Sequence, residues 1–331
     1  MAIGNSMGIG IPMVQLGLGG GGAPVEERFV ISVKTDNSGA SANNQFTLPT
    51  TGGGYNYNIE TSDGQTITGN TGDTTITFPS AGEYQLKISG SFPQCFFNGG
   101  GDRLKLLSID NFGIYALGGT SQFRAFKSCS NLVINAIDIG NFDNVTSFEQ
   151  TWYNCSSLTS FPLIDTSSGT SFSGAWDRCS GITSFPLIDT SSGSNFFAAF
   201  AVCSSLTSFP LLDTSSGTNF NYAWTKSSNL ASFPLLDTSS SNGFTGTWDQ
   251  CSSLTSFPSN AFDTTTTGSY NSAFATTNLT TQSIDNILVS LDTSGRSNGT
   301  FAQSGGQAPS ATGLAAKDNL VAKGWTITYT A

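Results

Sequence analysis

The sequence of 331 residues contains no histidine, and its glutamates are few and scattered. Without histidine, Ser-His and Cys-His nucleophile pairs and His-ligated metal centres are excluded. The scattered glutamates offer no convincing pair of carboxylates for the acid–base chemistry that cleaves glycosidic bonds. The glycine run at 19–22 lacks the Lys-Ser/Thr pair of a phosphate-binding loop. These absences predict a protein that is not an enzyme and that carries no cofactor.

Charge is also scarce, because only 10% of the residues are charged, and the formal net charge is −10. No stretch gathers the Lys and Arg side chains that binding to a phosphate backbone requires, so we expect no nucleic-acid partner. No apolar run is long enough to span a bilayer, so we expect no membrane insertion. The 25 phenylalanines exceed what a disordered chain would contain, which argues against disorder.

What the sequence has in abundance is repetition. The segment 152–162 returns with small changes from residues 176, 200, 224 and 248, always 24 residues apart. A fixed period in the twenties is the signature of a solenoid, in which a unit cannot close a core alone and stacks on its neighbours. We expect residues 158–161 and their copies to form short strands that end at the following proline. Equivalent strands would lie about 4.8 Å apart, and residues 165–169 would form a turn.

Stacking places equivalent residues in columns, and four columns of the repeat are apolar. Each unit has an aromatic residue, a Cys three positions on, an aliphatic residue three further on and a Phe three further on. We predict that these columns form the core of the repeat array. Their members are Trp152, Cys155, Leu158, Phe161, Trp176, Cys179, Ile182, Phe185, Phe200, Cys203, Leu206, Phe209, Trp224, Leu230, Phe233, Trp248, Cys251, Leu254 and Phe257.

The segments AWxxCxxI from residue 175 and AFxxCxxL from residue 199 resemble the Ala-Phe-x-x-Cys-x-x-Leu core of BspA-type leucine-rich repeats. The resemblance covers residues 104–280. It departs from the family where Ser227 replaces the Cys and where Trp often stands for Phe. Such repeats are found in bacterial surface proteins and in many proteins encoded by phages. The resemblance implies a curved right-handed solenoid that serves adhesion or acts as a rigid spacer, and no catalytic domain.

Five of the six cysteines fall on the repeat column, and only Cys95 lies outside it. No two cysteines form the short-spaced Cys-x-x-Cys pair of a metal site. The column can be a ladder of buried thiols that pack as small apolar side chains, or a series of disulfides between adjacent coils. We favour packing, because Ser227 interrupts the column without a compensating cysteine.

A column of aspartates is the one feature of the repeats that could hold a ligand. Stacked carboxylates at Asp165, Asp189, Asp213 and Asp237 would repel one another, and calcium could relieve that repulsion. The simpler interpretation is that each Asp accepts hydrogen bonds from its own turn, because no second acidic residue accompanies it as calcium loops require. The threonine column at 159, 183, 207 and 255 is broken by Ala231, and strand propensity explains it more simply than an ice- or glycan-binding surface.

The first residues lack the marks of a secretory signal, since no Lys or Arg precedes Arg28 and glycines interrupt the apolar residues. We therefore expect no export by the general secretory route. The segment is either a flexible tail or an extended peptide that docks on a partner, with the glycine run at 19–22 as a hinge. We favour docking, because the segment is more apolar than a solvated tail requires. Its proposed docking residues are Ile3, Ile9, Ile11, Val14 and Leu16.

Short segments between residues 29 and 88 alternate apolar and polar residues. We predict strands at 29–33, 45–48, 55–59, 75–78 and 84–88, with a hairpin turn at 62–64. Several strands at this spacing favour a small β-sandwich. The segment AGEYxLxI from residue 81 also resembles the last strands of polycystic-kidney-disease-type immunoglobulin-like domains, which implies a spacer or binding module.

The two ends of the repeat array depart from its middle. Residues 96–151 contain degenerate first coils, and one coil carries two extra residues, because Cys129 and Cys155 are 26 apart. Beyond residue 258 we predict a helix capped by Ser283, with apolar positions 284, 287, 288 and 291 on one face. A second helix over 314–323, ended by Gly324, and a strand over 325–329 would complete a cap that hides the last open core face. The segment NLVAKGWTIT from residue 319 resembles the terminus of many phage-encoded repeat proteins.

These observations predict a mainly β protein with four parts. A docking or flexible segment spans 1–27, and an immunoglobulin-like β-sandwich spans 28–95. A leucine-rich-repeat solenoid with 24-residue repeats spans 96–283, and an α/β cap spans 284–331.

The function that we predict is that of a non-enzymatic structural protein of a phage particle, either a head or tail fibre or a decoration protein. Its N-terminal segment would dock on other virion proteins after synthesis in the host cytoplasm. The solenoid would project from the virion surface to contact a host-surface glycan or protein, and a homotrimer is compatible with such a fibre. The alternative is a bacterial cell-surface adhesin. A polysaccharide depolymerase would need paired carboxylates in a groove, which the sequence does not offer.

Overall fold

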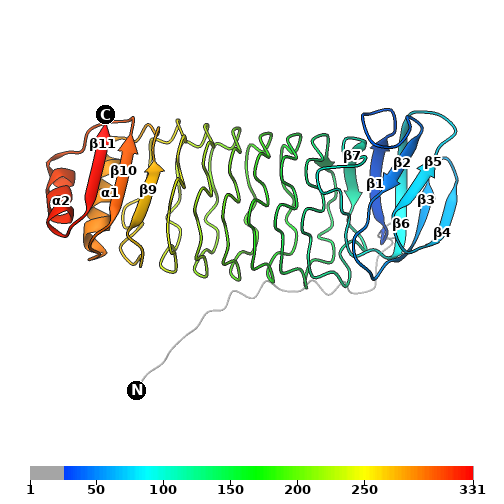
Figure 1. Ribbon diagram of the computed structural model, residues 1–331, viewed down its shortest axis with the longest axis horizontal. Helices are drawn as coiled ribbons and strands as arrows, with labels where there is room; N and C mark the ends of the chain where they lie inside the picture. Colours follow the sequence, from blue (N-terminus) through cyan, green and yellow to red (C-terminus); the bar gives the residue numbers. More distant parts are fainter. Residues whose placement is uncertain (1–25, 331) are drawn as a thin grey trace, which may run out of the picture.

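The computed structural model describes residues 26–330, so the proposed docking residues between Ile3 and Leu16 lie outside the described part of the chain. Figure 1 shows an elongated molecule with β-sheets at one end, a row of stacked coils in the middle, and two helices with a small sheet at the other end. The described residues are mainly β, as predicted, and α1 and α2 are the helices among them.

The N-terminal end contains a six-stranded sheet with the order β4-β3-β6-β1-β7-β8 and a two-stranded sheet of β2 and β5. All pairings in these two sheets are antiparallel except the parallel pair β7–β8. The five predicted strands are confirmed with small shifts of their ends, and Gly64 has the positive φ that the predicted hairpin turn requires. β4 was missed, because its residues are largely exposed and Ile67 is its one apolar side chain. The strands are β1 (Phe29–Lys34), β2 (Gln45–Leu48), β3 (Asn56–Thr61), β4 (Thr66–Asn70), β5 (Thr74–Thr77), β6 (Glu83–Ser91), β7 (Leu106–Asn111) and β8 (Val133–Ile134).

The N-terminal sheets and the coils are continuous. β7 lies within the predicted repeat segment, yet it pairs with β1 on one side and with β8 on the other. A buried ion pair adds a second connection, since Lys105 and Asp102 are both almost fully buried, with 3.9 Å between Nζ and Oδ1. Lys105 Nζ also donates to the carbonyl oxygens of Ser41, Ala42 and Gln45. These contacts fix the loop between β1 and β2 against the first coil.

Each coil in the middle of the molecule is one 24-residue turn of chain that hydrogen-bonds to the next. The amide of Trp152 donates to Ala175 O at 2.9 Å, and the amide of Trp176 donates to Ala199 O at 2.9 Å. Single parallel bridges also connect Ser147, Ser171, Asn195 and Asn219 in succession.

The prediction of strands at 158–161 and at the equivalent residues of the other coils was wrong, because no regular strand forms there. The coils are connected at this place by single bonds, such as Thr183 N–H to Thr159 O at 3.2 Å, and by isolated bridges such as that from Ser208 to Ser232. The proline at the end of each segment has no N–H to donate, so the row of bonds cannot extend into a ladder.

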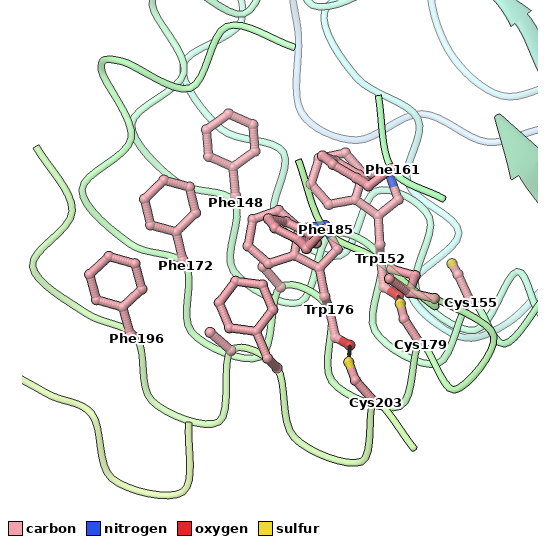
Figure 2. Close-up of a cluster of buried hydrophobic side chains, with 14 of the residues drawn as sticks. Phe148, Trp152, Cys155, Phe161, Phe172, Trp176, Cys179, Phe185, Phe196 and Cys203 are labelled. Atoms are coloured by element: carbon pink, nitrogen blue, oxygen red, sulfur yellow. Dashed lines mark hydrogen bonds between the residues drawn. The ribbon is translucent and has the colours of Figure 1, made fainter. Parts of the chain in front are cut away.

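Aromatic columns run along the inside of the coils, as Figure 2 shows for the first three coils of the array. Trp176 stacks on Trp152 at 5.7 Å and on Phe200 at 5.0 Å between ring centroids, and Phe185 meets it edge-on at 4.9 Å. All nineteen predicted core residues are buried. A further column was missed: it stacks at 5.3–6.0 Å and consists of Phe148, Phe172, Phe196, Phe220 and Phe244. Each aromatic pair adds about 0.5–1.5 kcal/mol beyond the burial of its area.

The C-terminal end is a three-stranded parallel sheet with the order β11-β10-β9, and its strands are connected by α1 and α2. The two predicted helices and the final strand are confirmed, but Ser283 is not the N-cap. Thr280 caps α1 by accepting from the amide of Ser283, whose own hydroxyl donates to Thr255 O in the preceding coil. No helix among residues 26–330 is long and apolar enough to cross a membrane. The elements are β9 (Ser269–Phe274), α1 (Thr281–Thr293), β10 (Thr300–Ser304), α2 (Ala311–Ala322) and β11 (Thr326–Thr330).

Candidate binding face of the coil stack

Each carboxylate of the predicted aspartate column accepts hydrogen bonds from its own turn. Oδ1 of Asp165 accepts from the amide of Ser167 at 3.0 Å and from its hydroxyl at 2.7 Å. Asp189 and Asp213 repeat this pair of bonds, and Asp237 keeps the amide bond. The same hydrogen bonds to Ser215 hold the pKa of Asp213 below its ordinary value. Within residues 26–330 no three His, Cys, Asp or Glu side chains come together as a metal would need. The structure therefore brings these carboxylates to turns rather than to one another.

The cysteine column has a polar role that the sequence analysis missed. All six cysteines are buried and free, and Cys155, Cys179, Cys203 and Cys251 donate from Sγ to the preceding coil. Trp152 O accepts from the amide of Cys155 at 3.1 Å and from Sγ of Cys179 in the next coil at 3.0 Å. Ser227 keeps the same bond, with Oγ 2.9 Å from Phe200 O. The column is a series of small donors, which explains why Ser can replace Cys there.

One face of the stack behaves differently from these repeated positions. We call it the variable face, and we define it by the positions three and two before, and one and two after, the central aromatic of each coil. It comprises residues 149–150, 153–154, 173–174, 177–178, 197–198, 201–202, 221–222, 225–226, 245–246 and 249–250. The second position after the aromatic is occupied in turn by Asn154, Arg178, Val202, Lys226 and Gln250, so no two coils agree. By contrast, the Ser-Phe-Pro at 160–162 is identical in all five coils.

The backbone of the variable face explains why its side chains can differ. The residues two before and two after the aromatic are left-handed in every coil, for example Gln150 at φ 52° and Asn154 at φ 58°. Their amides donate to the next coil, from Gln150 to Ser173 O at 2.9 Å and from Asn154 to Asp177 O at 2.7 Å. Because backbone groups satisfy these donors, the stacking requires no particular side chain at these positions.

A hollow of about 380 Å³ lies on this face above the coil of Phe200. The small side chains of Ala198, Ala201 and Val202 form its floor. Phe197 of the same coil also lines it, and the rest of the lining comes from other coils: Asp177, Arg178, Tyr222, Thr225, Lys226, Asp249 and Gln250. The volume lies within the range of ligand pockets, roughly 300–1,000 Å³.

Charge is distributed unevenly around the stack. All four Lys and Arg residues between 112 and 280 have equivalent positions on this side, namely Arg178 and Lys226 in the variable face and Arg124 and Lys127 beside Phe126. Side chains contact one another here from coil to coil, as when Arg178 Nε donates to the hydroxyl of Tyr153 at 3.0 Å.

Asp177 is the unusual carboxylate of this face. Its Oδ1 is buried and has no hydrogen-bond partner among the described residues. Burial raises the pKa of Asp177 to about 6, and the neighbouring charge and amide of Arg178 oppose that rise only in part. A buried acceptor without a donor is costly, so Asp177 is kept at this position at a cost to stability.

A different surface carries repeated rather than varied side chains. Leu163, Leu187, Leu211 and Leu235 occupy equivalent positions and are 49–64% exposed. They follow the proline of each coil and precede the aspartate turn, so they belong to the repeated part of the unit.

No protein-family model matches the sequence, and no curated protein sequence is significantly similar to it. The variable face could have been found from the sequence by comparing the five units with one another instead of seeking chemistry in the columns that they share.

Proposed function

We propose that the protein is a non-enzymatic binding protein of a phage particle and that its coil stack is a BspA-type leucine-rich-repeat solenoid with an immunoglobulin-like domain at its N-terminal end. In this proposal residues 1–27 dock on other virion proteins, and the solenoid projects outward to contact a host-surface glycan or protein. The 24-residue period, the Ala-aromatic-x-x-Cys-x-x-aliphatic pattern and the elongated shape in Figure 1 support it.

The observation that carries the binding role is the concentration of variation on one face. Units that are otherwise almost identical differ at positions that project from the surface and line a common hollow. In repeat proteins the extended surface of the stack is the usual binding surface, and the residues that face a ligand must differ where the ligand differs. A rigid spacer would have no reason to vary most at these positions.

Electron cryo-microscopy of the particle that carries this chain tests the virion role. We expect residues 1–27 to be held against a capsid or tail protein and α2 to point away from the particle. The symmetry of the attachment site would also give the number of subunits and test the homotrimer. If the chain is found on a bacterial envelope and on no particle, the alternative of a bacterial adhesin replaces the virion role.

A binding assay tests the adhesive role separately. The purified full chain, labelled with a fluorophore at an engineered cysteine in the exposed 51–53 loop, is incubated with a panel of bacterial cells. Saturable binding to some strains and not to others is expected. Uniform weak binding to all cells would contradict a specific adhesive function.

A further inference from the structure

The hollow above the coil of Phe200 combines features that distinguish it from the rest of the variable face. Phe197 and Tyr222 are each 41% exposed, and their rings meet edge-on with 5.8 Å between centroids. Aromatic rings of this size are normally covered, so the pair offers an apolar surface to something outside the chain.

The floor of the hollow is built at a cost to stability. Val202 has φ 56° and Ala198 has φ 50°, a left-handed conformation that favours Gly and Asn and that is strained for a branched side chain. Gly174 and Gly246 occupy the position of Ala198 in two other coils, and Asn154 occupies that of Val202 in another. Residues that would be less strained are thus used elsewhere, whereas this coil keeps small apolar side chains. The left-handed conformation is common to every coil, so what distinguishes this coil is that both positions carry small apolar side chains.

The rim supplies polar groups of balanced charge. Asp177 and Asp249 carry carboxylates, and Arg178 and Lys226 carry cations, with the amide of Gln250 between the coils. Asp177 lines the hollow, so its carboxylate can accept from a ligand hydroxyl, although its Oδ1 is buried within the protein and lies out of reach. Because the rim carries as many carboxylates as cations, it offers no net positive charge to favour an anionic ligand.

We propose that this hollow is a subsite for an uncharged hexopyranose unit of a surface glycan, an assignment that rests on the variable face being the binding surface. The C–H face of the pyranose ring lies against Phe197 and Tyr222, above Ala198 and Val202. Its hydroxyls donate to the carboxylate of Asp177 and accept from Lys226, which belong to the coils on either side of Phe200. A sugar ring has one apolar face and a rim of hydroxyls, which matches an aromatic surface bordered by charged and amide side chains.

The test uses the full chain on an array of bacterial capsular and lipopolysaccharide oligosaccharides, both neutral and anionic, with affinities of the best binders measured by calorimetry. The variants Phe197→Ala and Tyr222→Ala remove the aromatic surface. Phe123→Ala is the matched control, because Phe123 occupies the same position relative to Phe126 as Phe197 does to Phe200 but lies three coils away. Thermal unfolding of each variant shows whether it is folded.

We expect neutral hexose oligosaccharides to bind and each hollow variant to weaken binding about tenfold or more, while Phe123→Ala changes it less than about twofold. Binding only of anionic glycans, or equal losses for Phe197→Ala and Phe123→Ala, would overturn the subsite.

Cell binding separates this inference from the adhesive function itself. If the chain binds cells and neither hollow variant reduces that binding, adhesion stands and the hexose subsite is wrong. If the chain binds neither cells nor any glycan on the array, the adhesive function is wrong and the subsite fails with it. Competition by the free neutral oligosaccharide for cell binding would support both.

Discussion

The repeated edge and the variable face of the same coils use their side chains in opposite ways. On the repeated edge, side chains bond to the backbone: Thr166 Oγ1 donates to Asp189 O in the next coil at 2.5 Å, and Asp165 accepts from its own turn. On the variable face the amides of the left-handed residues donate to backbone carbonyls of the next coil, and side chains such as Arg178 and Lys226 project outward. A position whose backbone is satisfied by backbone can change without harm to the stack, and that freedom is what a binding surface needs.

The largest expected contrast comes from the core beneath the variable face. Trp176 is fully buried and stacks on both neighbouring coils, so Trp176→Ala should lower the free energy of unfolding by about 3–5 kcal/mol. Ser173→Ala, on the variable face of the same coil, should change it by less than about 0.5 kcal/mol. Urea unfolding followed by circular dichroism measures both. Similar losses of stability in the two variants would mean that side chains of the variable face contribute to folding as much as the core does.

A second contrast lies within the threonines of the repeat. Thr190 is buried and donates to Asp213 O at 2.5 Å, so Thr190→Val should cost about 1–3 kcal/mol by leaving that carbonyl without its donor. Thr183 is exposed, and its bond to Thr159 O is long at 3.4 Å. Thr183→Val should therefore be close to neutral in the same unfolding experiment. A large loss at Thr183 would show that the threonine column matters to stacking as a whole.

Asp177 is the position on the variable face where the needs of binding and of stability should conflict. Its folded pKa of about 6 exceeds the unfolded value of about 3.9, so the folded state binds the proton more tightly. This contribution to stability is present at about pH 4 and is lost as the pH rises through about 6. Asp177→Asn should remove the dependence and raise stability at pH 7 by about 1–2 kcal/mol, after allowance for solvent screening.

Urea unfolding at several pH values between 4 and 7 tests this prediction, with Asp189→Asn as the control. Asp189 is exposed and bonded within its turn, so its variant should not be stabilised at pH 7. Parallel pH profiles for the wild type and Asp177→Asn would show that Asp177 is not perturbed.

The smallest effect should come from the floor of the hollow. Val202→Asn replaces a branched residue with one that tolerates the left-handed conformation, so it should stabilise the fold by about 0.5–1 kcal/mol. Val202→Ile keeps the β-branched apolar side chain, so this control should not stabilise the fold. The gain in stability should accompany weaker glycan binding. A variant that gained both stability and affinity would show that the strained backbone at Val202 does not serve binding.

Much of the fold follows from patterns in the sequence, and the exceptions have physical causes. The alternation at 29–33 and 84–88 correctly predicts two strands that pair along their length as β1 and β6. The same reasoning fails at 158–161, where proline and the turns of a narrow coil prevent a ladder from forming. Ser283 has the chemistry of a helix cap, yet a contact with the preceding coil moves the start of α1 to Thr280. Local propensity is overruled where a residue has a partner in another coil.

The sequence by itself determined the period, the columns and the two ends of the array, because a 24-residue unit can bury its aromatic residues only against copies of itself. The tertiary structure alone decided which positions share a surface. Residues 177–178, 197–198 and 222 meet in one hollow because left-handed residues turn the chain at each coil and inter-coil amide bonds fix the register. Hydropathy does not encode those turns, since Gln, Arg, Ala, Val, Tyr and Lys all adopt them when the next coil accepts their amides.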